Sequence, residues 1–331
     1  MSKHKGVLVC GEVTGAVLTS IDKELLGAGR KLADDLAEEL SFLLMGDNLG
    51  SISNEAIAYG ADQVYVASGP MESDYQSDTY VETITQVCQE LFPSILILGH
   101  TDIGAEIAPR VAARLNTALV TDCVDLRIDP ETKLLVRTKP IYGGNALAEI
   151  ISESRPQMVT VRPKSFSPVQ PDETRQGKII PVTLRRPAPA GARLIEKFRE
   201  DIGGPKLEDA EVVVCGGAGV AGPEGFNLLR KLAEVLGGAV GATRVPCQEG
   251  WVPPSLEIGQ TGKVVAPKLY IAVGVSGAMQ HIAGCLGSKF IVAINTDPEA
   301  NIFKVADFGI VADFKEALPA FIETCKQLLH D

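Results

Sequence analysis

The sequence lacks the features that point to metal chemistry, a membrane span or nucleic-acid binding. Its seven cysteines form no CxxC pair, and none of the four histidines clusters with them, so no zinc or iron–sulfur site is indicated. No apolar run approaches the roughly 20 residues of a membrane-spanning helix. A net charge of -11 would repel nucleic acids and anionic membranes at long range. We therefore expect no metal, no nucleic-acid partner and no membrane insertion.

Aromatic residues are also scarce, at 5% of the chain, whereas aliphatic residues and glycine are abundant. That balance is typical of parallel sheets covered by helices. At 331 residues the chain is too long for one ordinary core. We predict an α/β fold of two domains, each built on a mostly parallel sheet flanked by helices.

The amino-terminal segment MSKHKGVLVCGEV enters an apolar run almost at once. It leaves no room for a signal or transit peptide. Thiols without a disulfide framework are typical of the cytosol. We therefore expect a cytoplasmic, prokaryotic location.

The first half alternates short apolar runs with amphipathic segments. The apolar runs predict strands at Gly6–Cys10, Phe42–Gly46, Gln63–Ser68, Ile95–Gly99, Lys133–Thr138, Leu147–Ser152 and Gln157–Val161. The amphipathic segments predict helices at Leu25–Leu40, Tyr80–Leu91 and Gly104–Leu115. Such a βαβ series predicts a parallel, right-handed sheet. The polar turn with His100 and Thr101 lies where open sheets bind ligands, although a capped helix with His100 in solvent explains it better.

Composition changes between Pro163 and Pro205, where prolines and charged residues surround one strand-like run, Lys178–Leu184. Because proline restricts the chain, this stretch predicts an ordered crossover, with a short helix at Ala192–Asp201. We predict a nucleotide-binding-like domain over residues 1–165 and a crossover over residues 166–206, whose strand returns to the first domain. A second domain then spans residues 207–331.

The second domain opens with a pattern of dinucleotide-binding proteins. A strand-like run, Glu211–Cys215, precedes GAGVAG at Gly217–Gly222, and Pro223–Leu236 has helical periodicity. That fingerprint also requires an acidic residue about 20 positions on. The chain has Arg244 there instead. A nicotinamide site with a phosphorylated ribose and a site for a different ring system both remain open.

A second ligand-binding pattern lies between two further strand-like runs, Leu269–Val273 and Phe290–Asn295. The turn Gly274–Ala278 is rich in small residues, which let backbone amides approach a ligand. Ser276 is placed to cap the helix that follows. The turn is therefore a candidate anion site, and His281 lies one helical turn beyond it.

Five motifs follow one another in the second half: GATR at Gly241–Arg244, IGQTGKVVAP at Ile258–Pro267, LYIAVGVSGAMQH at Leu269–His281, IVAINTDPEANIF at Ile291–Phe303 and ADFGIVAD at Ala306–Asp313. In this order they resemble the electron-transferring flavoprotein alpha subunit family. The resemblance implies a Rossmann-like FAD-binding domain over residues 207–331. It also implies a heterodimer, in which the first domain is scaffold and contact surface for a beta subunit.

The resemblance further implies what the heterodimer does. It would be an electron carrier rather than a stand-alone enzyme. Electrons would pass between an acyl-CoA dehydrogenase-like partner, as in fatty acid oxidation, and another redox protein. One alternative is an electron-bifurcating, NADH-dependent complex. An alternative of another class is a non-redox nucleotide-binding regulatory module, which the βαβ pattern of the first domain also allows.

By position in the family motifs, three side chains are expected to tune the flavin. Arg244 corresponds to the cation beside the ring, Thr261 to the hydroxyl near N5 and His281 to a donor toward O2. A fixed positive charge favours the negative charge that reduction brings to the ring. The other cofactor-binding residues implied are Thr243, Ile258, Gly259, Gln260, Ser276, Gly277, Ala278, Met279, Gln280, Asn295, Asp313 and Phe314. No proton-transfer catalyst is expected, because the cofactor carries the chemistry.

The chain departs from the family pattern at a few positions. Ala218 stands where an arginine is usual, which predicts weaker FAD binding unless another group substitutes. Gln248 stands where an aspartate is common after the GATR arginine, and Asn301 and Phe308 replace a usual proline and tyrosine. Nothing in the sequence explains these last three.

Overall fold

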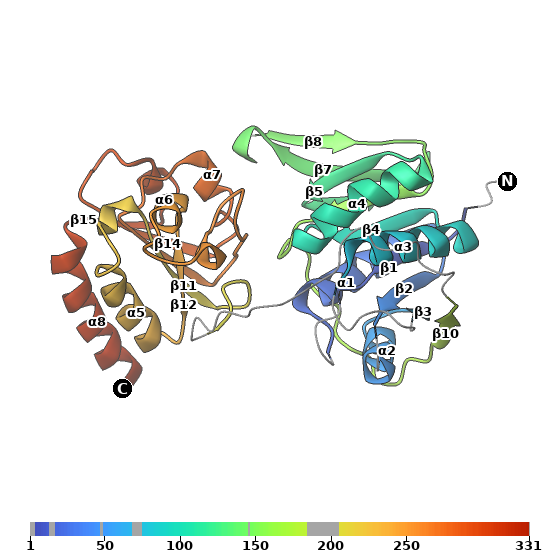
Figure 1. Cartoon of the computed structure of the whole chain (residues 1–331), viewed down its shortest axis with the longest axis horizontal. Helices are drawn as coiled ribbons and strands as arrows, with labels where there is room; N and C mark the ends of the chain where they lie inside the picture. The colour runs from blue at the N-terminus through green and yellow to red at the C-terminus, as the bar shows by residue number, and fades with distance from the viewer. Residues whose placement is uncertain are drawn as a thin grey trace. The chain divides into compact units, whose positions relative to one another are not determined.

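The computed structural model describes residues 4–12, 17–46, 49–67, 75–144, 146–183 and 205–330. The chain divides into two compact units, unit 1 over residues 1–198 and unit 2 over residues 199–331 (Figure 1). Each unit contains a parallel sheet flanked by helices. The predicted α/β fold class is therefore confirmed.

Unit 1 is built on seven parallel strands in the order β10-β3-β2-β1-β4-β9-β5. They are β1 Val7–Cys10, β2 Leu40–Met45, β3 Gln63–Ala67, β4 Ile95–Gly99, β5 Leu119–Cys123, β9 Gln157–Val161 and β10 Lys178–Val182. All six strand pairs in this order are parallel. The chain runs outward from β1 through β2 to β3 and then crosses to β4, so the strand order reverses between β1 and β4.

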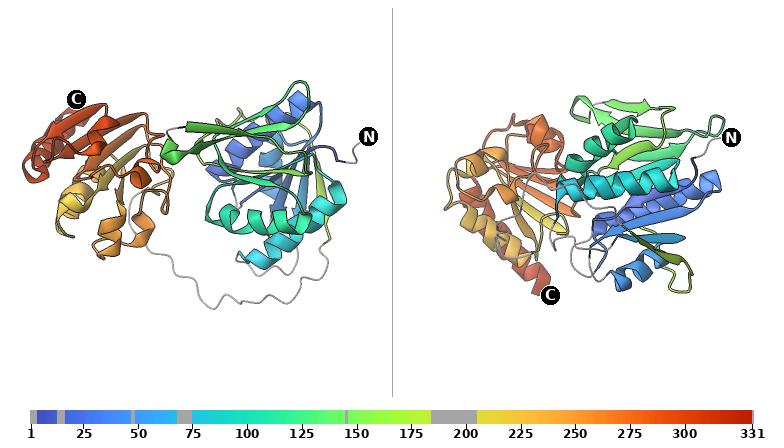
Figure 2. Two further views of the ribbon diagram at one scale, coloured as in Figure 1. Left: turned by 90° about the horizontal axis from the view of Figure 1, so that it is seen from above. Right: turned by 45° about the vertical axis from the view of Figure 1, so that its right-hand side comes forward.

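Helices cover both faces of this sheet. They are α1 Ser20–Leu36, α2 Gly50–Ala58, α3 Ser77–Leu91 and α4 Asp102–Leu115. Val7 and Val9 pack in one core cluster with residues of α1 and α2, whereas Leu8 and Cys10 pack in another with residues of α3 and α4. Because successive strand residues point to opposite faces, the two clusters lie on opposite sides of the sheet. The helices that contribute to them accordingly cover opposite faces (Figure 2).

A smaller antiparallel sheet, in the order β6-β7-β8, differs from the expected parallel series. Its strands are β6 Asp125–Ile128, β7 Leu135–Ile141 and β8 Ala146–Ile150. The segments predicted at Lys133–Thr138 and Leu147–Ser152 correspond to β7 and β8, which pair antiparallel. The reason is the short connection between them, since parallel neighbours need a crossover of a dozen or more residues.

Some element boundaries also differ from expectation. The first helix begins at Ser20 rather than Leu25, because Thr19 and Asp22 form a capping box there. It ends at Leu36, since Ala37 adopts a left-handed conformation with φ 53°. The elements α2, β5, β6 and β12 had no clear periodic signal. The helix expected at Ala192–Asp201 lies outside the described residues.

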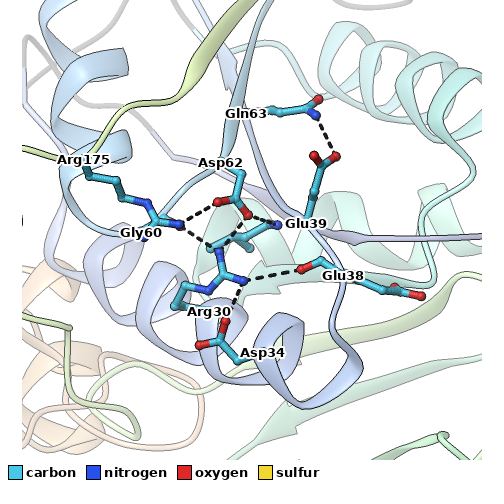
Figure 3. A network of polar contacts seen from close by, with 9 residues as sticks. Arg30, Asp34, Glu38, Glu39, Gly60, Asp62, Gln63 and Arg175 are labelled. Carbon is cyan, nitrogen blue, oxygen red and sulfur yellow. Dashed lines mark hydrogen bonds and ion pairs between the residues drawn. The ribbon is translucent and has the colours of Figure 1, made fainter.

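The segment that follows β9 is tied back to unit 1. β10 pairs parallel with β3, and Arg175 donates to Asp62 at 2.6 Å (Figure 3). Asp62 also accepts from Arg30 at 2.8 Å and from the Leu40 amide at 2.8 Å. Burial would raise the pKa of Asp62, but these donors outweigh it, and its pKa lies below the ordinary value. The charged network thus anchors the crossover to the sheet edge.

Unit 2 has five parallel strands in the order β12-β11-β13-β14-β15. They are β11 Val212–Gly216, β12 Ala239–Ala242, β13 Leu269–Val273, β14 Phe290–Asn295 and β15 Phe308–Val311. Its helices are α5 Phe226–Val235, α6 Arg244–Gln248, α7 Met279–Ile282 and α8 Phe314–His330. The long helices α5 and α8 lie side by side against the sheet (Figure 1). Strand order reverses between β11 and β13.

Candidate functional site

The carboxyl ends of the five strands of unit 2 form the edge at which the predicted site residues lie. In open α/β sheets, ligands bind outside this edge where the strand order reverses. In unit 2 the reversal lies between β11 and β13. The loops that follow these two strands are Gly216–Gly222 and Gly274–Ala278, the two glycine-rich motifs of the sequence.

The glycines after β11 serve close packing of these two loops. The Gly217 amide donates to the Val273 carbonyl at 2.9 Å, and the Gly219 amide donates to the Gly274 carbonyl at 3.0 Å. A methyl group added to Gly217 would lie 2.2 Å from the Gly274 oxygen. These amides therefore face protein rather than a pyrophosphate. Together with Arg244 in place of an acidic residue, this geometry argues against a nicotinamide dinucleotide fingerprint.

The turn after β13 presents unused backbone donors. Gly274 and Gly277 have φ values of 60° and 82°, which favour glycine. None of the described residues accepts a hydrogen bond from the amide of Ser276, Gly277 or Ala278. Ser276 and Ala278 are exposed. A row of free amides in such a turn is suited to an anion such as a diphosphate.

The expected capping role of Ser276 is wrong. Helix α7 begins at Met279, and its N-cap position is Ala278, whose side chain cannot accept a hydrogen bond. Two glycines with positive φ extend the turn and so delay the helix. The Ser276 carbonyl instead accepts from the Ile302 amide at 3.2 Å, which fixes the turn against the segment after β14.

The loop that contains Thr261 is held against the same turn. The Gln260 amide donates to the Gln280 carbonyl at 2.8 Å, and the Ile258 amide donates to the Ala242 carbonyl at 2.9 Å. Gly259 has φ 153°. The Thr261 hydroxyl is exposed and donates to the Glu257 carboxylate at 2.7 Å. The loop thus links the end of β12 to α7 and carries a hydroxyl on its outer side.

His281 is buried, with an exposed fraction of 6%, and both ring nitrogens contact protein atoms. Nδ1 lies 2.9 Å from the Ile258 carbonyl, and Nε2 lies 3.0 Å from the Tyr270 hydroxyl. A carbonyl oxygen only accepts, so Nδ1 has the proton and Tyr270 donates to Nε2. Burial lowers the pKa of His281, although the Ile258 bond opposes this. The ring is therefore neutral near neutral pH, and Nε2 could donate to a ligand only if Tyr270 released it and the ring proton moved from Nδ1 to Nε2.

The end of β12 carries the cation. The Thr243 amide donates to the Gly216 carbonyl at 2.9 Å, which holds the ends of β11 and β12 together. Thr243 is the N-cap residue of α6, and Arg244 begins that helix with an exposed side chain. The positive charge thus lies at the reversal edge, beside the loop after β11.

The remaining predicted residues lie at the ends of β14 and β15. The Asn295 amide donates to the Val275 carbonyl at 2.8 Å, so its side chain stabilises the turn after β13. Asp313 is exposed and accepts from the Lys315 amide at 2.9 Å at the start of α8. Phe314 packs in the core, with an exposed fraction of 7%. Its side chain supports the edge from inside rather than facing a ligand.

All fifteen predicted cofactor residues therefore lie along one edge of one sheet. Sequence reasoning missed Tyr270 and Glu257, which bond to two of them. Tyr270 lies inside an apolar strand run, where an aromatic residue usually belongs to the core, so no sequence signal marked it. Among the described residues, no three side chains of the metal-binding types cluster, and no helix is long and apolar enough to cross a membrane.

Comparisons with known proteins agree with this division of the chain. Residues 7–186 match the electron transfer flavoprotein domain, and residues 206–286 match the electron transfer flavoprotein FAD-binding domain. The electron transfer flavoprotein subunit alpha of Thermoanaerobacterium thermosaccharolyticum is 42% identical over 330 residues, which cover 99% of this chain and 100% of that protein. The subunit of the same name from Bacillus subtilis is 42% identical, with 98% of each chain covered. Protein FixB of Azotobacter vinelandii is 40% identical, over 98% of this chain and 91% of that protein.

Proposed function

Because the chain belongs to the electron transfer flavoprotein family as an alpha subunit, we propose that unit 2 holds FAD along the carboxyl edge of its sheet. FAD is the cofactor of the family domain that matches residues 206–286. The observation that supports the position is the reversal edge between β11 and β13, where free amides, exposed hydroxyls and one cation lie together.

The donor set fits the two ends of this cofactor. The amides of Ser276, Gly277 and Ala278 suit the diphosphate, since none of the described residues uses them. Glycine at 277 is required, because a methyl group there would lie 2.2 Å from the Ile302 nitrogen. The exposed residues Arg244 and Thr261, next to Thr243 and Gln260, supply a cation and a hydroxyl for the ring. Asp313 and the backbone around Asn295 are left for the adenosine end.

Bound FAD supplies reversible electron transfer, and the residues of this chain set how readily it is reduced. The Arg244 guanidinium provides a fixed positive charge. Thr261 must turn its hydroxyl from Glu257 toward the ring before it can donate there. His281 acts through its bond to Ile258, which holds the Gln260–Thr261 loop in place. Met279 and Gln280, which follow the turn, are exposed and within reach of the same cofactor.

We further propose that the chain pairs with a beta subunit as a heterodimer in the cytoplasm. The names of its relatives, which are alpha subunits, support a partner of this kind. Unit 1 would provide scaffold and beta-subunit contacts. The heterodimer would carry electrons between an acyl-CoA dehydrogenase-type enzyme and another redox protein, with oxidoreductase activity only in such complexes.

The experiment that tests this function is anaerobic titration of the co-purified heterodimer, followed by its visible spectrum. A yellow protein that an artificial reductant bleaches, and NADH does not, is the expected result for a simple carrier. Bleaching by NADH would favour the electron-bifurcating alternative. A colourless heterodimer after expression with ample FAD would contradict the proposed function.

A further inference from the structure

Arg244 and Gln248 stand four residues apart in α6, so their side chains meet on one face of the helix. With the Gln248 amide oriented so that its oxygen faces the guanidinium, Oε1 lies 2.9 Å from Nε and 3.2 Å from Nη2 of Arg244. The opposite orientation would place the amide donors against the guanidinium donors, which satisfies neither group. Gln248 therefore accepts two hydrogen bonds from the cation.

No carboxylate among the described residues pairs with Arg244. The nearby Glu257 accepts from the Thr261 hydroxyl, and Lys263 pairs with Glu208. A neutral amide orients a guanidinium but leaves its charge in place, whereas a carboxylate would also neutralise it. At this position the chain has an acceptor without a negative charge.

We propose that Gln248 is a positioning residue for the flavin: it holds the Arg244 guanidinium in place while leaving its positive charge uncompensated. The proposal rests on the proposed function, because the bound flavin is the group on which that charge acts. An uncompensated cation favours the reduced, more negative state of the cofactor. Gln248 accordingly makes this flavin easier to reduce than a carboxylate at position 248 would.

The first test concerns the contact itself and does not depend on bound FAD. In heterodimer labelled with 15N-arginine, the Nε–H signal of Arg244 is identified by its loss in Arg244→Met. Gln248→Met should shift this signal, and Gln248→Glu should shift it in a different direction because the acceptor becomes charged. An Nε–H signal that is the same in all Gln248 variants would show that the contact does not exist in solution.

The second test measures the midpoint potential of the bound flavin in the heterodimer. Gln248→Glu adds a negative charge with almost no change in side-chain shape. One unit charge several ångströms away at a protein surface changes such an equilibrium about tenfold, so the equilibrium constant for one-electron reduction of the flavin should fall by about that factor. For a one-electron couple that is about 59 mV. Gln248→Met keeps the charge of Arg244 but removes the hydrogen bonds that orient its guanidinium. This variant should lower the equilibrium constant for flavin reduction only about twofold.

A double-mutant comparison decides whether Gln248 acts through Arg244. In the Arg244→Met background, Gln248→Met should have no further effect, since nothing is left to orient. An equal effect in both backgrounds would overturn the proposal, as would a Gln248→Glu potential equal to that of the parent. A Gln248→Met shift as large as that of Gln248→Glu would overturn the role of charge. A parent heterodimer that binds no FAD would instead overturn the proposed function on which this proposal rests.

Discussion

The two sheets of this chain reverse their strand order in the same way, but the residues at the two reversal edges differ in kind. In unit 1 the described part of the edge has Glu12, which accepts from the Thr101 hydroxyl at 2.6 Å, and Asp22, which accepts from the Glu12 amide at 2.8 Å. In unit 2 the corresponding edge has free amides and Arg244. The first edge uses its donors internally and is acidic, whereas the second offers donors and a positive charge.

The difference shows that topology provides a place for a ligand but not the chemistry to bind one. An anionic cofactor would meet carboxylates at the edge of unit 1. Burial, opposed by the Thr101 bond, raises the pKa of Glu12 to about 7, so part of this acid is neutral near neutral pH. The histidines near the two edges follow the opposite pattern: His100 in unit 1 is half-buried beside Thr160, whereas His281 in unit 2 is buried with both nitrogens bonded.

The largest effect is expected from Gly277→Ala in unit 2. The new methyl group would lie 2.2 Å from the Ile302 nitrogen at a residue with φ 82°. Overpacking and backbone strain together should destabilise unit 2 by about 2–4 kcal/mol and abolish FAD binding. Denaturation followed by the single tryptophan, Trp251, reports on unit 2 alone.

Two glycines provide controls for this prediction. Gly237→Ala has a similar φ of 62° but open space around the methyl group, so it should cost only about 1 kcal/mol. In unit 1, a methyl group on Gly104 would lie 1.8 Å from the Gly99 oxygen. Gly104→Ala should therefore destabilise unit 1, yet the folded heterodimer should retain FAD. Equal loss of FAD from the Gly104 and Gly277 variants would contradict the proposal that the edge of unit 2, and not that of unit 1, binds FAD.

The acidic edge predicts a pH-dependent effect of Glu12→Gln. The pKa of Glu12 rises from 4.5 to about 7 on folding, so its ionisation destabilises unit 1 increasingly as pH rises through this range. Replacement by glutamine should stabilise unit 1 by about 1–3 kcal/mol at pH 8 and have little effect near pH 4. Hydrogen exchange of the peptides that cover β1 and β4 measures the change.

Glu24 is the matched control, because its pKa is also about 7, raised by burial and lowered partly by the Lys164 amide. Glu24→Gln should stabilise unit 1 with a similar dependence on pH. The gain in hydrogen-exchange protection should centre on α1 and the segment after β9 rather than on β4. A gain from Glu12→Gln that is equal at pH 4 and pH 8 would mean that shape, not ionisation, causes it.

A smaller effect is expected from Tyr270→Phe, which removes the donor to His281 Nε2. A buried acceptor left without a partner costs about 1–2 kcal/mol, and Trp251 fluorescence again measures it. In unit 1, Tyr65→Phe removes a half-buried hydroxyl that donates to Gln63 and should cost less than about 0.5 kcal/mol, as measured by hydrogen exchange of β3. Nitrogen NMR that finds the proton of His281 on Nε2 in the parent would contradict the assigned tautomer.

Much of the fold followed from periodicity, because buried parallel strands are short apolar runs. β4, β9, β13 and β14 match their predicted bounds. Elements with mixed polarity, such as β5 with its Thr-Asp pair, had no such signal, since tertiary pairing rather than local pattern forms them. The antiparallel β7 and β8 were recognised as strands but not as a separate sheet, because pairing partners are set by connection length.

For the candidate site, the sequence indicated which segments of unit 2 to consider, but it did not indicate the contacts that their side chains make. The residues that the family resemblance implied for the cofactor lie in loops along one edge of the sheet in unit 2. The motifs could not show that the Asn295 and His281 side chains bond to backbone carbonyls, or that Phe314 belongs to the core. Those contacts depend on residues distant in the chain. The Arg244–Gln248 contact was not predicted either, because no helix was expected at residues 244–248 and the pairing of residues four apart follows only once α6 is formed.

The smallest expected effect tests position 218, where the resemblance implies a positive charge that unit 2 lacks. Ala218 is exposed in the loop after β11, which packs on the turn with the free amides. Ala218→Arg would add a second cation at this edge and should slow FAD dissociation about threefold, a gain of under 1 kcal/mol, as expected for an exposed charge pair.

The rate of FAD dissociation is measured by flavin fluorescence after dilution, and 0.5 M salt should remove most of the gain. Ala218→Gln, which has similar reach without charge, should leave the rate unchanged. Dissociation as fast in Ala218→Arg as in the parent would mean that other donors at this edge already neutralise the diphosphate.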